Sequence, residues 1–236
     1  MVQDSGVTSA AARDLVILDV PAEAQAAHAR LLGAEPAEIL TAGAIDVAVG
    51  APSWASASGL LVAADDAAVA AKLAERRGLT LTDVGTGFAG PADGLALGYA
   101  GPTVPGAAPD AEITGVDHVV LTSPNRDRII ATLCGRLDFD LRLDRVQSWG
   151  VHQLFFRRGD LLVEVVLQEG EGVDPAGPDA LWGLAWRTVD ADATHARLTD
   201  HGITVSDVRR GAKPGTRVAT IKDPALGVPT IVLEQS

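Results

Sequence analysis

Aromatic residues, cysteine and positive charge are all scarce in this chain of 236 residues. Aromatic residues make up 4%, there is one cysteine, and 19 lysines and arginines face 31 aspartates and glutamates, which gives a formal net charge of -12. A single cysteine excludes an internal disulfide framework. An acidic chain also lacks the basic surface that nucleic acids and anionic membranes require. We therefore expect neither nucleic acid nor membrane as a partner.

Long hydrophobic runs are missing as well. No stretch approaches the length of about 20 apolar residues that spans a bilayer. The first residues, 1–12, lack the charged start and apolar stretch of a signal peptide. We expect a cytoplasmic protein with a disordered segment at 1–12.

The chain does contain an internal repeat. A strand-like apolar run leads into a helical pattern and then into further strand-like segments, and this order begins four times, near Leu15, Gly59, His118 and Leu184. Turn residues separate segments of period-2 apolar character, which is typical of strands, including one expected at Ile203 to Val208. Each unit is predicted to be βαβββ, with a strand missing in the N-terminal half.

A segment rich in proline and glycine divides these four units into two pairs. Its core, GPTVPGAAP, holds three prolines and two glycines, which prevent regular structure. We predict an α+β fold of paired βαβββ modules in two tandem domains, at 13–100 and 114–236, joined by a linker at 101–113.

Two motifs in the C-terminal half resemble the vicinal oxygen chelate superfamily of glyoxalases, bleomycin-resistance proteins, extradiol dioxygenases and methylmalonyl-CoA epimerases. They are GVDHVVL, which starts at Gly115, and LVEVV, which starts at Leu162. The motifs WGLAWR from Trp182 and KPGTR from Lys213 are similar to an uncharacterised glyoxalase-like bacterial branch. The resemblance implies a glyoxalase fold whose curved sheets form a cup for a divalent metal. Over the first domain it is only architectural, so that domain is expected to be degenerate and to support folding or assembly.

His118 and Glu164 are the candidate catalytic residues. A carboxylate inside an apolar strand needs a cation, a proton or strong hydrogen bonds, and the histidine is its natural neighbour. The resemblance implies that both are metal ligands. It also places Gly183 and Ile231 where the second imidazole and carboxylate would be, so the ligand set is incomplete unless Gln153 or His152 substitutes.

Three interpretations of the pair remain open. It holds a divalent metal, it forms an acid–base dyad in which the carboxylate orients the imidazole, or it is a hydrogen-bonded pair at the floor of a binding cup.

A further group of residues is predicted to bind substrate. Arg187 is in register with Gly183 on the expected cup face, and guanidinium groups bind carboxylate or phosphate well. The basic run near Arg217 is explained either as an anion clamp or as a solvated hairpin. Trp182 is expected to line the pocket and Gly183 to leave volume for ligand. The full set is Gln153, Trp182, Gly183, Arg187, Lys213 and Arg217.

Two other signals are set aside. Gly85 to Gly90 matches GxGxxG, yet Pro91 follows where a helix must begin, so no nucleotide cofactor is expected. The histidines on predicted helices, His28 among them, are expected at the surface.

These observations predict a glyoxalase-like protein that acts on or binds a small oxygenated, anionic metabolite. The favoured hypothesis is an enzyme of lyase, isomerase or hydrolase type, for which a homodimer is one expected assembly. The alternative is a non-catalytic protein that sequesters its ligand. Extradiol dioxygenase chemistry is less favoured, because the second histidine of its iron site is missing.

Overall fold

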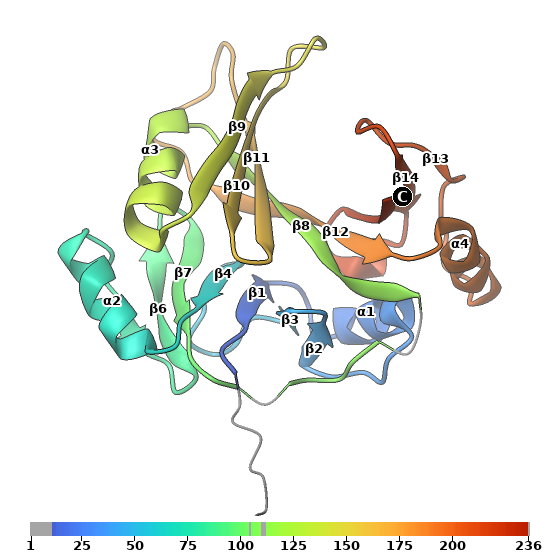
Figure 1. Ribbon diagram of the computed structural model, residues 1–236, viewed down its shortest axis with the longest axis horizontal. Helices are drawn as coiled ribbons and strands as arrows, with labels where there is room; N and C mark the ends of the chain where they lie inside the picture. The colour runs from blue at the N-terminus through green and yellow to red at the C-terminus, as the bar shows by residue number, and fades with distance from the viewer. Residues whose placement is uncertain (1–10, 104, 110–111, 236) are drawn as a thin grey trace, which may run out of the picture.

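The computed structural model describes residues 11–103, 105–109 and 112–235, which form two mixed sheets of seven and eight strands (Figure 1). Residues 1–10 of the predicted disordered segment lie outside the described residues. None of the helices in the described part of the chain is long and apolar enough to cross a membrane.

The N-terminal elements are β1 (Asp14–Leu18), α1 (Ala24–Leu32), β2 (Ile39–Ala42), β3 (Ile45–Val49), β4 (Gly59–Ala63), α2 (Ala67–Arg76), β5 (Thr82–Asp83), β6 (Gly87–Ala92) and β7 (Leu95–Ala100). The C-terminal elements are β8 (Ile113–Ser123), α3 (Arg126–Ile130), the π-helical turn η1 (Ala131–Arg136), β9 (Asp140–Val146), β10 (His152–Arg158), β11 (Leu161–Leu167), β12 (Ala180–Thr188), α4 (Ala191–Asp200), β13 (Arg209–Arg210), β14 (Thr216–Ile221), the 3-10 turn η2 (Pro224–Leu226) and β15 (Thr230–Gln235).

The C-terminal sheet confirms the predicted pair of βαβββ modules. Its strand order is β13-β14-β15-β12-β8-β11-β10-β9. In each module the last strand runs parallel to the first, as β11 does to β8 and β15 to β12, while the two first strands pair antiparallel at the centre. The sheet is therefore two equivalent halves joined through β8 and β12, the strands that carry the candidate site.

The N-terminal sheet follows the same plan with one strand fewer. Its order is β2-β3-β1-β4-β7-β6-β5, and its first module has only two strands after α1. The first module is therefore the one that lacks a strand, as was expected for one module of the N-terminal half. Strand β7 ends at Ala100 and β8 begins at Ile113, so the predicted linker at 101–113 overlaps the start of β8 by one residue.

One local prediction differs from the structure. Residues Ile203 to Val208 form no strand and contribute one isolated bridge, between Val205 and Ile221. The GxGxxG segment, from Gly87 onward, belongs to strand β6. A Cβ on Gly87 would lie 2.1 Å from the carbonyl oxygen of Tyr99. This glycine therefore allows close strand approach.

The helix-facing sides of both sheets bury one continuous hydrophobic core. Leu31 of α1, Tyr99 of β7, Leu133 of η1 and Trp186 of β12 all belong to it, and each is at most 2% exposed. Hydrogen bonds also join the two halves, for example from the Tyr99 hydroxyl to the Arg136 carbonyl at 2.9 Å. The two domains are thus packed on each other through their convex sides.

His28 belongs to this junction, and the prediction that it lies at the surface is wrong. Its side chain is fully buried, and Nε2 lies 3.0 Å from the carbonyl oxygen of Leu226. A carbonyl only accepts, so Nε2 carries the proton, while Nδ1 has no partner among the described residues. Burial lowers the pKa of His28, although the hydrogen bond to Leu226 and the charge of Asp223 oppose the shift.

We expect His28 to make the protein less stable in mild acid. The unfolded histidine takes up a proton near its ordinary pKa of 6.5 and the folded one does not, so the free energy of unfolding decreases as the pH falls below that value. Thermal unfolding at about pH 7.5 and about pH 5.5 should show a smaller decrease in Tm for His28→Gln than for the wild-type chain. An equal decrease in both would contradict this role. His152, whose pKa is raised, contributes with the opposite sign in both proteins and does not affect the comparison.

Candidate functional site

The candidate site lies on the concave face of the C-terminal sheet. Figure 1 shows this sheet curled, with β9–β11 rising on one side of β8 and β12 and with β13 and β14 on the other. Val119 and Val163 are fully buried in the core on the convex side. Because strand residues alternate between faces, His118 and Glu164 lie on the concave face.

The structure brings His118 and Glu164 together and adds a second carboxylate. The Nε2 atom of His118 lies 3.4 Å from Oε2 of Glu164, and its Nδ1 atom lies 2.9 Å from Oδ2 of Asp117. The register shifts where His118 pairs with Ala185 and Val116 pairs with the next residue of β12. This bulge in β8 leaves Asp117 unpaired in the ladder and turns it beside the imidazole.

The pair is part of a longer hydrogen-bonded row. Gln153 donates to Oε1 of Glu164 at 2.5 Å, and Gln147 donates to Oε1 of Gln153 at 2.6 Å. At the other end, Nε of Arg187 donates to Oδ1 of Asp117 at 3.2 Å. We call these residues the polar row: Arg187, Asp117, His118, Glu164, Gln153 and Gln147.

The electrostatics of the polar row favour an ionised Asp117. Burial alone would raise the pKa of Asp117, but the hydrogen bond and charge of His118 and the charge of Arg187 outweigh it and lower that pKa below its usual value. An ionised carboxylate only accepts, so Nδ1 of His118 carries a proton and Nε2 faces Glu164. The side chains of His118, Glu164 and Asp117 are only 12–15% exposed, which limits solvent screening without closing the site.

The residues present do not fit a resident divalent metal. The site offers one imidazole and one carboxylate at the expected positions, whereas such ions are generally held by three or more protein ligands. The described part of the chain contains no group of three or more histidine, cysteine, aspartate or glutamate side chains placed to hold a metal. The two other positions implied by the resemblance hold Gly183 and Ile231, which supply neither an imidazole nor a carboxylate.

Gly183 does not provide the room that was expected of it. A Cβ at this position would lie 2.5 Å from the carbonyl oxygen of Pro229. The neighbouring strand therefore closes the position to any side chain, histidine included, and the expectation that this glycine leaves volume for ligand is not supported.

His152 does not substitute for the missing ligands either. Its Nε2 atom lies 2.7 Å from Asp144 and its Nδ1 atom lies 2.9 Å from Glu169. Hydrogen bonds to these two carboxylates raise the pKa of His152. Adjacent strand residues face opposite sides, so His152 and Gln153 point away from each other.

The remaining predicted binding residues lie apart from the polar row. Arg217 binds both carboxylate oxygens of Asp192 at 2.7 and 2.8 Å, which directs it toward α4 on the convex side. Lys213 is exposed and donates to Gln235 at 3.1 Å. The structure therefore does not bring these two to the site. Trp182, at a register shift in β12, is 53% exposed.

Three residues near the site were missed by sequence reasoning. Asp117 joins the polar row through a bulge in β8, and Gln147 joins it from the turn after β9. Neither feature produces a periodic pattern of apolar residues in the sequence. Arg145 pairs directly with Gln153 across β9 and β10, so it lies on the concave face. It makes no hydrogen bond or ion pair with the described residues, and the alternation of β9 could have revealed it.

The comparisons with known proteins agree with this fold. Residues 117–220 match the family model described as Glyoxalase/Bleomycin resistance protein/Dioxygenase superfamily. No curated protein sequence matches the chain. The solved structure of methylmalonyl-CoA epimerase from Mycobacterium tuberculosis is 21% identical over 54% of this chain and 91% of its own, with a TM-score of 0.45.

Two larger structures resemble the chain over nearly its whole length. A mutant of 4-hydroxymandelate synthase from Streptomyces coelicolor is 12% identical, with a TM-score of 0.67, over 97% of this chain and 93% of its own. A xylose isomerase-like TIM barrel/4-hydroxyphenylpyruvate dioxygenase fusion protein is 15% identical, with a TM-score of 0.65, over 97% of this chain and 50% of its own. These likenesses show the two-domain fold.

The region at 117–220, which carries the polar row, therefore matches the glyoxalase/bleomycin-resistance/dioxygenase, or vicinal oxygen chelate, superfamily. The match to the family model begins at Asp117, inside strand β8, and ends in β14, so it covers the modules that carry the polar row.

Proposed function

We propose that the C-terminal domain binds a small oxygenated, anionic metabolite on the polar row and catalyses proton transfer with His118 as the acid–base group. The observation that carries this proposal is an imidazole between two carboxylates, 2.9 Å from Asp117 and 3.4 Å from Glu164, in a partly exposed position. A carboxylate that accepts from Nδ1–H fixes the imidazole tautomer and the orientation of the ring, which leaves Nε2 as the nitrogen that can accept a proton.

The two carboxylates have different roles in this mechanism. Asp117, kept ionised by its neighbours, orients the ring of His118. Glu164 faces Nε2 at 3.4 Å, longer than a typical N–H···O hydrogen bond, so Nε2 is not held in a close hydrogen bond and is available to a substrate. The pair can thus take a proton from a C–H group next to a carbonyl and return it.

Arg187 supports the expected preference for an anion. It is 52% exposed, and its Nε atom alone is used in the contact with Asp117, which leaves the other guanidinium N–H groups for a carboxylate. Arg145, which has no ion pair among the described residues, provides a second cation on the far wall of the concave face. A ligand that binds Arg187 would have its oxygenated carbon next to His118.

Deuterium exchange tests the proposal even though the substrate is unidentified. The chain is incubated in D2O with a panel of 2-oxo and 2-hydroxy acids, and NMR follows loss of each C–H signal. At least one acid should exchange faster with protein than in buffer alone. Because the donor set does not fit a resident metal, treatment with a chelator should leave the rate unchanged. A rate that disappears with the chelator and returns with a divalent metal would overturn the mechanism.

The alternative is ligand sequestration without chemistry. It is favoured by the hydrogen bond that Gln153 donates to Glu164, because this carboxylate already has a partner within the polar row. It predicts acids that bind, as seen by shifts of protein amide signals, and that are recovered without deuterium.

A further inference from the structure

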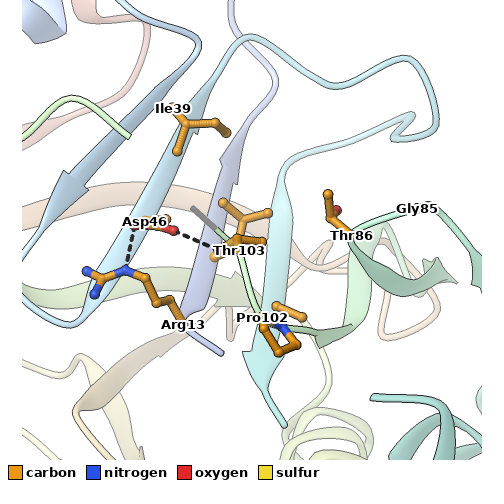
Figure 2. Close-up of a pocket in the computed structure, with 9 residues that line it drawn as sticks. Arg13, Ile39, Asp46, Gly85, Thr86, Pro102 and Thr103 are labelled. Carbon is orange, nitrogen blue, oxygen red and sulfur yellow. Dashed lines mark hydrogen bonds and ion pairs between the residues drawn. The ribbon is translucent and has the colours of Figure 1, made fainter. Parts of the chain in front are cut away.

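The N-terminal sheet has a cavity of its own, on the face that corresponds to the site of the C-terminal sheet. The cavity has a volume of about 370 Å³ and is lined by residues of β1, β2, β3, the β5–β6 turn and the segment after β7. Figure 2 shows Arg13, Asp46 and Thr103 joined in one group, with Ile39, Thr86 and Pro102 around them. Leu15, which holds the position equivalent to His118, also lines it.

Most of the concave face around this cavity is filled by the protein itself. Ile17 and Leu61 are fully buried in a small hydrophobic cluster on this side, and Trp54 and Ala55 from the loop before β4 pack against it. The cavity is what remains at one end of the face. The chemistry of its walls therefore decides what can enter.

The floor of the cavity is a buried carboxylate, that of Asp46, which can accept further hydrogen bonds. Asp46 is 3% exposed, and its Oδ1 atom accepts from Nε of Arg13 at 2.8 Å and from the hydroxyl of Thr41 at 2.7 Å. Its Oδ2 atom has one partner among the described residues, the hydroxyl of Thr103, at the long distance of 3.4 Å. A carboxylate oxygen normally accepts two hydrogen bonds, so Oδ2 is available to a donor in the cavity.

The charges at this floor already balance. Arg13 neutralises Asp46, so a cationic ligand would bring an uncompensated charge, and an anionic ligand would face the carboxylate. The remaining walls at Leu15, Ala100 and Pro102 are apolar. The volume is at the small end of the 300–1,000 Å³ that ligand pockets span.

We propose that this cavity is a second ligand site, for a small uncharged and partly apolar molecule whose hydroxyl or amide N–H donates to Oδ2 of Asp46. This site does not depend on His118 or Glu164, and it gives the N-terminal domain a binding role of its own.

A matched set of probes tests the proposal on the full chain. Benzyl alcohol, benzylamine, benzoate and toluene share one ring and differ in charge and hydrogen bonding. Titration followed by protein NMR should show benzyl alcohol shifting the amide signals of Gly85, Thr86 and Thr103. Both charged probes should bind at least roughly tenfold more weakly, because a charge would have to be buried without a partner. Toluene should also bind more weakly than benzyl alcohol.

Two variants locate the binding. Leu15→Trp should fill the cavity and abolish the shifts, whereas the matched control Leu73→Trp, at a 42% exposed position on α2, should keep them. Thr86→Trp, at the exposed rim, provides a second block if Leu15→Trp does not fold. The shifts should persist in His118→Ala.

Several results would overturn the proposal. They are no shift at these amides with any probe, shifts that survive both blocking variants, or charged probes that bind as well as benzyl alcohol.

Discussion

Replacement of His118 by alanine is expected to lower the rate of deuterium exchange by about 10²–10⁴-fold, the range that a positioned acid–base group contributes. The variant removes the imidazole that lies between the carboxylates of Asp117 and Glu164, and neither carboxylate occupies the place of its Nε2 atom. The anion contacts of Arg187 remain, so ligand binding should change much less than turnover. Exchange rates by NMR and ligand titration of the same preparation measure both quantities.

Companion variants show whether the effect is chemical. Glu164→Gln preserves the shape of the side chain but removes its charge, and should also lower the rate strongly. His201→Ala is the matched control, because this exposed histidine follows α4 and its side chain hydrogen-bonds to the carbonyl of Arg197, away from the polar row. Wild-type exchange in His118→Ala would remove the mechanism, and intact ligand recovered from every protein would favour sequestration.

Leu31→Ala is expected to destabilise both domains together. Leu31 is fully buried in the core that the two sheets share, and Arg197 of α4 donates to its carbonyl at 2.9 Å. Loss of a buried leucine side chain typically lowers the free energy of unfolding by about 2–5 kcal/mol. Because the core is continuous, urea unfolding should remain one transition, displaced to lower concentration.

Hydrogen exchange provides the decisive measurement for this variant. Amides of Val163 and Val165, in a strand of the other domain, should lose protection by the same free energy as those of β1. Leu73→Ala, at an exposed position on α2, should have little effect. Two separate transitions, or loss of protection confined to the N-terminal half, would contradict a shared core.

Much of the fold could be predicted because each strand and helix of the repeated units depends on residues that are close together in the sequence. Strands such as β11 alternate between buried and partly exposed residues, and Asp190 caps α4 by accepting from the amides of Asp192 and Ala193, two residues close to it in the sequence. Features that depend on distant backbone were not predicted. Strand β6 needs glycines that let β7 approach, and His28 is buried only because the other domain covers α1.

The candidate site also has residues that the sequence predicted and residues that it did not. The meeting of His118 and Glu164 follows from strand alternation and the parallel pairing of β8 with β11. The contribution of Asp117 follows from a bulge, which no periodic pattern shows. Arg217 was misplaced because an ion pair with Asp192 on α4 holds it on the convex side, and such a long-range partner is invisible in a local motif.

The continuous core has a consequence for how this protein can change over evolutionary time. A deletion of the N-terminal half would strip the C-terminal sheet of the neighbour that covers its convex side, so selection for the polar row alone suffices to retain both halves. The first half is therefore retained because the C-terminal sheet needs it, whatever its own concave face binds. The residues of that face can therefore be substituted without loss of the polar row, and its cavity can come to bind a different kind of ligand.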